Sequence, residues 1–221
     1  MIVLLDSELV FAGFLNHVLP KKERSFVRAR KSSMTAQTES EDSRDPQPAA
    51  TVSPRRIVLT GFMGSGKSTV GPLLAARLGW RFVDVDDVIE AETGVRIAEL
   101  FARHGEARFR EREHATILRL TAGDSLVLAL GGGAIEHHET RSLLLTAPGT
   151  LLVHLEVELA TTLARCRGTE ATRPILADQA NLASRYWSRL PLYRAAHVSI
   201  AVDALTPDEV VGAILQAARR P

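Results

Sequence analysis

The sequence predicts an α/β fold in which a five-stranded parallel sheet is flanked by helices. Two observations support this class. Beyond Arg55, short runs rich in β-branched residues alternate with longer helix-favouring runs, the pattern of strands joined by helical crossovers. A glycine-rich loop also stands between the first such strand and the first helix, as in many α/β proteins that bind phosphates.

The elements follow in order along the chain. Strands are predicted at residues 56–60, 81–85, 125–130, 150–156 and 198–202. Helices are predicted at residues 66–78, 87–92, 97–103, 106–121, 138–145, 158–166, 181–194 and 207–219. The last helix has the clearest start, because Thr206 can cap it, Pro207 suits its first position and Glu209 completes a capping box. Pro72 inside the first helix predicts a kink or a looser first turn.

Residues 1–54 are predicted to be a disordered extension ahead of a folded domain at residues 55–221. From Met34 to Pro54 the chain has hardly a bulky apolar residue, so it cannot offset the entropy lost on ordering. We hypothesise that the native product starts at Met34. The apolar N-terminus resembles an export signal only superficially, because Asp6 and Glu8 interrupt it and no basic region precedes it.

The composition indicates which classes of partner and which cellular compartment to expect. The 221 residues carry a formal net charge of +1, which gives no general field for nucleic acid. The apolar runs are too short to span a bilayer, so we expect no membrane partner. The single cysteine, Cys166, cannot form an intrachain disulfide and suits a reducing, cytoplasmic setting. A monomer is expected.

A nucleoside triphosphate site is predicted at Gly61 to Ser68, which spell G-x-x-x-x-G-K-S between a strand and a helix. Glycines allow several backbone N–H groups to converge on phosphates, and the helix N-terminus adds its positive dipole. Lys67 can reach the terminal phosphates, and the Ser68 hydroxyl can hold Mg²⁺. No Asn-Lys-x-Asp guanine-binding motif occurs, which argues against a GTPase.

Asp84 and Asp86 follow the second predicted strand. Strand alternation predicts that both lie on one face at the carboxyl end, where ligands bind in open α/β sheets. One carboxylate can order water around Mg²⁺, and the other can align or deprotonate an acceptor hydroxyl. The residues equally fit a second interpretation, an acidic helix N-terminus that favours the helix dipole.

Gly131, Gly132 and Gly133 end the third predicted strand. They predict backbone N–H groups that face an anion or a transferring phosphoryl group, because a simple turn rarely needs three glycines. Upstream, Arg110 and Glu113 stand three residues apart on a charged helix, where they can pair and hold the guanidinium rigid. Most other charges of that helix are expected to form a solvated face.

Two arginine-bearing segments complete the candidates. Residues 165–174 predict a mobile loop whose arginines can close on phosphates and expel water. The segment from Arg189 to Arg194 ends a helix with guanidinium groups that can grip a carboxylate. Each of these arginines, taken singly, also fits an ordinary surface position.

Together these motifs closely resemble shikimate kinase, in matching order and comparable spacing from about Arg56 to the C-terminus. The blocks are residues 61–68, Asp84-x-Asp86, Phe109-Arg110, Gly131-Gly132-Gly133-Ala134, Arg173-Pro174 and Arg189-x-Pro191-Leu192-Tyr193-Arg194. The resemblance implies a P-loop fold of the nucleoside-monophosphate-kinase type, with a lid and a substrate-binding helical region. It implies transfer of the γ-phosphoryl of ATP to the 3-hydroxyl of shikimate, within chorismate and aromatic amino acid biosynthesis.

The resemblance also implies roles for individual residues. The catalytic residues would be Lys67, Asp86 and Arg173. ATP would be bound by Gly64, Ser65, Gly66, Lys67, Ser68, Thr69, Arg167, Arg173 and Pro207, and Mg²⁺ by Ser68 with Asp84 through water. Shikimate would be bound by Asp86, Arg110, Gly131, Gly132, Gly133 and Arg189. The adenine is expected near Arg165 or Arg167, because ungapped counting places Cys166 where the family often has arginine.

Two alternatives remain beside this reading. One is another P-loop small-molecule kinase, for gluconate or a nucleoside monophosphate, although a nucleotide acceptor would call for base-recognising side chains. The other is a catalytically silent, nucleotide-gated binding module. That module would predict loss of Lys67, Asp86 or Arg173, and all three are present.

Overall fold

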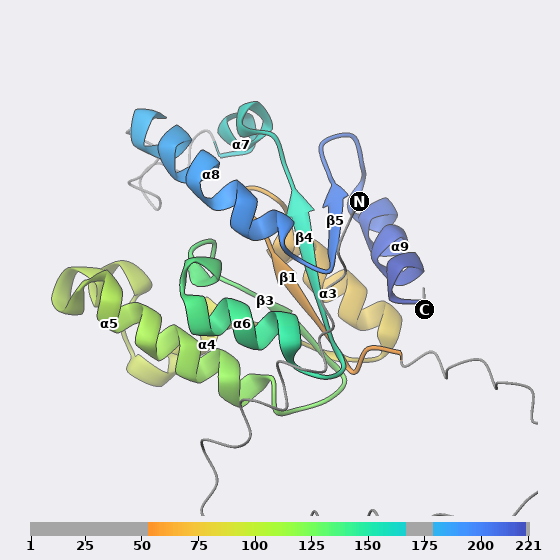
Figure 1. Ribbon diagram of the computed structural model, residues 1–221, viewed down its shortest axis with the longest axis horizontal. Coiled ribbons are helices and arrows are strands. Elements are labelled where there is room, and N and C mark those ends of the chain that lie inside the picture. Colours follow the sequence, from red (N-terminus) through yellow and green to blue (C-terminus); the bar gives the residue numbers. More distant parts are fainter. Residues whose placement is uncertain (1–52, 167–178, 220–221) are drawn as a thin grey trace, which may run out of the picture. The chain divides into compact units, whose positions relative to one another are not determined.

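The computed structural model describes residues 53–166 and 179–219. Within this part of the chain, five strands form one parallel sheet in the order β2-β3-β1-β4-β5, which confirms the predicted fold class (Figure 1). The strands are β1 (Arg56–Thr60), β2 (Arg81–Asp84), β3 (Leu126–Ala129), β4 (Thr150–Glu156) and β5 (Val198–Ala201). The hypothesis of a start at Met34, and nearly all of the predicted disordered extension, lie outside the described residues.

Helices cover both faces of the sheet. They are α3 (Lys67–Leu78), α4 (Val85–Thr93), α5 (Ile97–Leu120), α6 (His138–Thr146), α7 (Leu159–Arg165), α8 (Gln179–Arg194) and α9 (Pro207–Ala218). The helices α3 and α9 pack together on one side, whereas α6 packs against β4 on the other (Figure 1). The capping box expected at the start of α9 is present, with Glu209 bonded to the Thr206 backbone.

The structure differs from the sequence-based expectation at two places. The helix α4 begins at Val85 because the Asp84 carboxylate accepts the backbone N–H of Asp86 at 3.1 Å and caps it. The strand-alternation argument for Asp84 and Asp86 was therefore wrong, since Asp86 lies in a helical turn. A short 3₁₀ helix, η1 (Ala134–Glu136), follows the glycine run and was not predicted.

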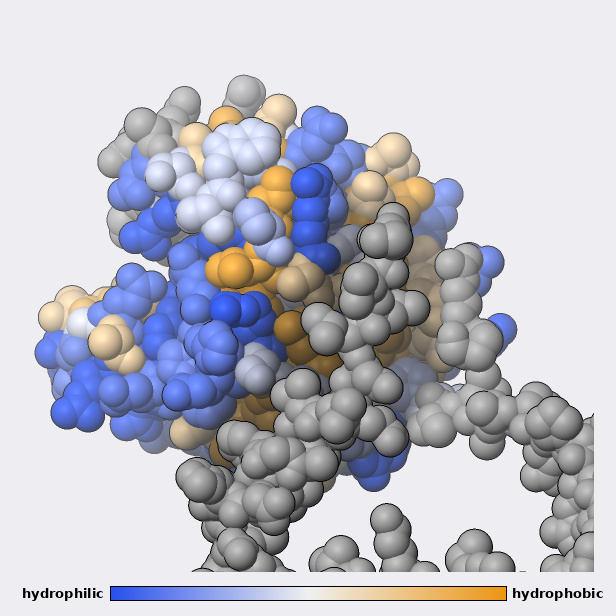
Figure 2. Space-filling view, in the orientation of Figure 1, coloured by the Kyte–Doolittle hydropathy of each residue, from blue (hydrophilic) through white to orange (hydrophobic). Residues whose placement is uncertain are grey.

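The helix α5 spans both helices predicted between residues 97 and 121. Gly105 interrupts its regular geometry with φ 77° and ψ 168°, so the break falls between the two predicted segments. The outer side of α5 is largely hydrophilic, as its charged sequence predicts (Figure 2).

The centre of the sheet is buried and mostly apolar. Ile57, Val58 and Leu59 of β1 are completely inaccessible to solvent. The helix α3 runs without interruption past Pro72, and the neighbouring Gly71 approaches the Phe82 ring so closely that an added Cβ would lie 2.2 Å from Cε2. Among the described residues, no helix is both long and apolar enough to cross a membrane.

Candidate active site

The phosphate-binding loop lies between β1 and α3. Its backbone demands glycine at Gly61, where φ is 144° and an added Cβ would lie 2.6 Å from the Leu155 carbonyl oxygen of β4. Gly64 and Gly66 also have positive φ, and Gly66 caps α3. The loop therefore presents backbone N–H groups beside a helix N-terminus, the arrangement that suits bound phosphates.

Lys67 lies across this loop. Its Nζ donates to the carbonyl oxygens of Gly61 at 2.7 Å and Phe62 at 3.1 Å. The ammonium group is thus held at the loop by the same backbone that would surround a phosphate. This position is consistent with a cation that neutralises terminal phosphates.

Ser68 and Asp84 meet at the carboxyl end of β2. The Ser68 hydroxyl donates to Asp84 Oδ2 at 3.3 Å, so two hard oxygen donors stand together next to the loop. Among the described residues, no group of three or more His, Cys, Asp or Glu could hold a metal. Mg²⁺ fits the pair nevertheless, because it keeps several waters and takes further oxygens from phosphates.

Asp86 is a partly buried carboxyl group beside that pair. Burial, with a further contribution from the charge of Asp84, raises its pKa to about 6. Gly131 packs directly against it, since an added Cβ there would lie 2.9 Å from Asp86 Oδ1. A carboxylate with a raised pKa, exposed to a cleft, is suited to accept a proton from a hydroxyl group.

The run of three glycines after β3 packs against charged side chains of the site. At Gly133 an added Cβ would lie 1.9 Å from Arg110 Nη2, so only glycine leaves room for this guanidinium. None of the three has a positive φ. Close approach of Asp86 to Gly131 and of Arg110 to Gly133, rather than an unusual backbone conformation, thus explains the need for glycine at these two positions, whereas an added Cβ at Gly132 would meet no atom nearer than 3.8 Å.

Arg110 is held by two glutamates of its own helix. Its Nη1 donates to Glu113 Oε2 at 2.6 Å, as expected, and its Nη2 donates to Glu106 Oε1 at 3.0 Å. The guanidinium also lies over the Phe109 ring, 5.2 Å from its centroid. Glu113 is buried, and burial raises its pKa to about 7 even though Arg110 opposes the shift.

Arg189 enters the same region from α8. Its Nη2 donates to Glu136 Oε2 at 2.7 Å, and its side chain is only 7% exposed. Tyr193, one turn further, donates its hydroxyl to the Gly132 carbonyl and ties α8 to the glycine run. Arg194 differs from the expectation, because it pairs with Glu156 instead of lining the cleft.

One cleft of about 1240 Å³ joins these parts. Its lining includes every predicted site residue that the structure describes, namely Gly64, Ser65, Gly66, Lys67, Ser68, Thr69, Asp84, Asp86, Arg110, Gly131, Gly132, Gly133, Arg189 and Pro207. Arg165 also lines it and donates to the Gly64 carbonyl at 3.1 Å. Arg167 and Arg173 lie outside the described residues.

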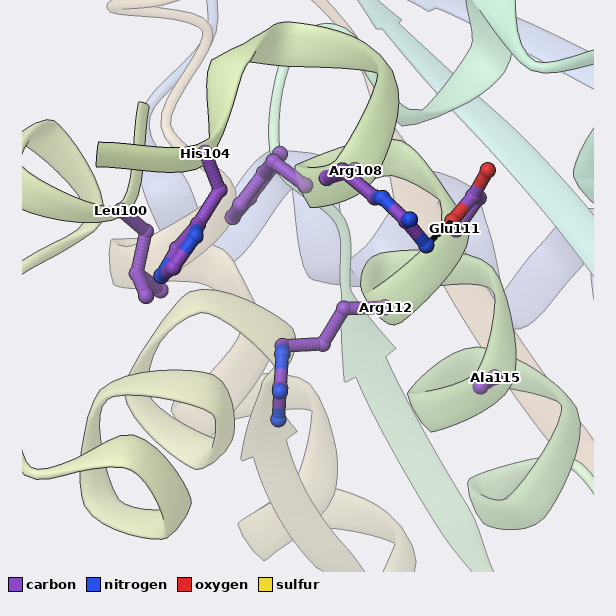
Figure 3. A pocket seen from close by; sticks show the side chains of 7 residues that line it. Leu100, His104, Arg108, Glu111, Arg112 and Ala115 are labelled. Atoms are coloured by element: carbon purple, nitrogen blue, oxygen red, sulfur yellow. Dashed lines mark hydrogen bonds and ion pairs between the residues drawn. The ribbon is translucent and has the colours of Figure 1, made fainter. Parts of the chain in front are cut away.

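A separate hollow of about 630 Å³ lies along α5 (Figure 3). It is lined by Leu100, His104, Arg108, Phe109, Glu111, Arg112 and Ala115. It contains neither the phosphate loop nor the glycine run. We therefore assign the function to the larger cleft.

Sequence reasoning missed three residues that contact Arg110, Arg189 or the glycine run. Glu106 was assigned to a solvated face, although it bonds Arg110. Glu136 and Tyr193 were given no role, although each connects α8 to the segment after β3. A helical spacing of four residues would have suggested the pairing of Glu106 with Arg110. The contacts of Glu136 and Tyr193 join distant segments and leave no local pattern.

Comparison with known proteins agrees with this geometry. The family model described as shikimate kinase matches residues 63–219. The chain belongs to the shikimate kinase family. It is 41% identical over 174 residues to a shikimate kinase of Salinibacter ruber, covering 74% of this chain and 84% of that protein.

Solved structures give the same assignment. A shikimate kinase from Acinetobacter baumannii, in complex with shikimate, superposes with a TM-score of 0.69 at 36% identity, covering 76% of this chain and 94% of that one. A gluconokinase from Sinorhizobium meliloti has a TM-score of 0.50 at 21% identity, covering 75% and 92%. At that identity, the gluconokinase supports only a shared fold, so the alternative of a gluconate kinase is not favoured.

Proposed function

We propose that the chain is an ATP-dependent shikimate kinase, which transfers the γ-phosphoryl of ATP to the 3-hydroxyl of shikimate. The observation that carries this proposal is the single cleft in which Lys67 and its loop face Asp86, Arg110 and Arg189. Lys67 and the phosphate loop suit a triphosphate. Arg110, Arg189 and Asp86 suit a small acid with ring hydroxyls, because guanidinium groups bind carboxylates and a carboxylate group binds hydroxyls.

On the nucleotide side, the loop amides and Lys67 balance the phosphate charges. We propose that Ser68 holds Mg²⁺ directly and Asp84 holds it through water, which the 3.3 Å contact between these side chains supports. Mg²⁺ would neutralise charge on the bridging phosphate oxygens. Arg165, anchored to Gly64, is the described arginine best placed near Pro207 for the adenine. Roles for Arg167 and Arg173 remain predictions.

On the acceptor side, Arg110 and Arg189 bind the shikimate carboxylate, and the amides of the glycine run bind its ring oxygens. Asp86 accepts a hydrogen bond from the 3-hydroxyl and takes its proton as the new bond to phosphorus forms. The bond between the γ-phosphorus and the β-bridging oxygen breaks, and ADP leaves with that electron pair. Because the transition state is loose, catalysis depends mostly on alignment and charge stabilisation.

The test is an ADP-release assay with ATP and Mg²⁺ against shikimate, gluconate and nucleoside monophosphates. We expect turnover with shikimate and none above background with the other acceptors. Turnover with gluconate or a nucleotide in place of shikimate would overturn the proposal, and so would shikimate binding without turnover, the behaviour of a silent module. A monomeric state and a cytoplasmic location remain predictions from the sequence.

A further inference from the structure

The buried guanidinium assigned to the substrate carboxylate already contacts a carboxylate of the protein. Arg189 Nη2 lies 2.7 Å from Glu136 Oε2. Glu136 belongs to η1, where its backbone N–H donates to the Gly133 carbonyl at 3.0 Å and Arg141 Nη1 donates to the Ile135 carbonyl at 2.8 Å. The backbone of Glu136 is therefore fixed, while its side chain is 37% exposed and lines a hollow of about 550 Å³ together with Arg110 and Arg189, which also line the cleft.

Packing restricts Arg189 in addition to its contact with Glu136. Its side chain is 7% exposed, so packing within α8 and against the glycine run restricts its torsions. Its Nε is buried and has no partner among the described residues, which leaves a donor unused even with Glu136 in contact. The main effect of Glu136 on the Arg189 guanidinium is therefore its negative charge.

That charge has the same sign as the substrate. In the described part of the chain, the carboxyl groups of Asp86, Glu106, Glu113 and Glu136 lie around the acceptor region with the guanidinium groups of Arg110, Arg185 and Arg189, and Glu136 contacts that of Arg189. An incoming carboxylate must share Arg189 with Glu136 or displace it. Like charges on one guanidinium repel, and partial exposure reduces the repulsion without removing it.

We propose that Glu136 is an affinity- and specificity-determining residue of the acceptor site: a built-in carboxylate that pairs with Arg189 until the substrate carboxylate replaces it. Glu136 thereby weakens the binding of acidic acceptors. This inference rests on the proposed function, because it takes the acceptor to be a carboxylate bound at Arg189.

The variant Glu136→Gln removes the charge and keeps the size of the side chain. We expect the KM for shikimate to fall about 3- to 10-fold, with kcat and the KM for ATP unchanged, which is the range for a like charge in a partly hydrated site. The ratio of the KM for shikimate of the wild type to that of the variant should shrink when NaCl rises from 0.05 to 0.5 M, because salt screens the repulsion between Glu136 and the substrate carboxylate. Affinity for shikimate methyl ester, which has no carboxylate, should not rise.

The matched control is Glu139→Gln, an exposed glutamate of α6 that lines neither the cleft nor the hollow containing Glu136. It removes the same charge three residues away and should leave the KM for shikimate unchanged. An unchanged or higher KM in folded Glu136→Gln would overturn the inference, since it would mean that Glu136 holds Arg189 in place. If the wild type fails to phosphorylate shikimate, the proposed function fails, and calorimetric binding of shikimate to both proteins still tests the inference.

Discussion

Replacing Arg189 with alanine should weaken shikimate binding far more than it slows the chemical step. The guanidinium is buried and lines the cleft from α8. Two charge-assisted hydrogen bonds to a carboxylate, at about 1.5 kcal/mol each, give about 3 kcal/mol. At about 1.4 kcal/mol per tenfold change, this corresponds to roughly a 150-fold rise in the KM for shikimate. Glu136, left without its partner, is exposed enough to be hydrated.

Steady-state ADP release over a shikimate titration measures this effect, with thermal unfolding as a check that the variant is folded. Arg189→Lys keeps a charge but loses the planar geometry of the guanidinium, so its KM should fall between those of wild type and Arg189→Ala. Arg194→Ala is the matched control, because Arg194 lies on the same helix, pairs with Glu156 and does not line the cleft. Equal KM values for wild type and Arg189→Ala would refute the assignment of Arg189 to the carboxylate.

Three further predictions concern other groups. Lys67→Met should lower kcat about 100- to 1,000-fold, because a positioned cation is lost from the developing charge, and single-turnover rates near wild type would contradict this. Asp86→Asn should lower kcat about 100-fold or more through loss of the proton acceptor, while calorimetry should still detect ATP binding. The pKa of buried His154 is lowered to about 4, so the stability that its neutral form provides above pH 6.5 is lost as the pH falls toward 4. Between pH 7.5 and 5.5, the wild type should lose about 1 kcal/mol more unfolding free energy than His154→Gln, and equal losses in urea titrations would disprove the neutral assignment.

Much of the fold was predictable because its signals are local. Buried parallel strands leave short apolar runs, and Thr206, Pro207 and Glu209 mark a helix start within four residues. The phosphate loop is local too, since its glycines, lysine and serine are contiguous. Predictions based on such short-range patterns agreed with the structure to within two residues at most element ends.

Asp84 and Asp86 show where short-range reasoning failed. Strand periodicity was extended to Asp86, two residues past the end of β2, because the capping contact between the Asp84 carboxylate and the Asp86 N–H competes with continuation of the strand. Both carboxylates still line the cleft, but for a different reason. The sequence left two interpretations of Asp84 and Asp86, an acidic helix N-terminus and a functional site. The structure combines them, because the N-terminus of α4 places both carboxyl groups in the cleft.

The acceptor site was harder to predict, because its energetics depend on pairs that the sequence separates. Glu136 and Arg189 are 53 residues apart, and nothing near either one indicates the other. Arg110, in contrast, has both of its glutamates within four residues, so local spacing can indicate them. A binding arginine is recognisable from a motif, but the carboxylates that compete with its ligand are not. Proteins that share these arginines can therefore differ in substrate affinity through residues such as Glu136, which contacts a motif arginine but is not itself part of a motif.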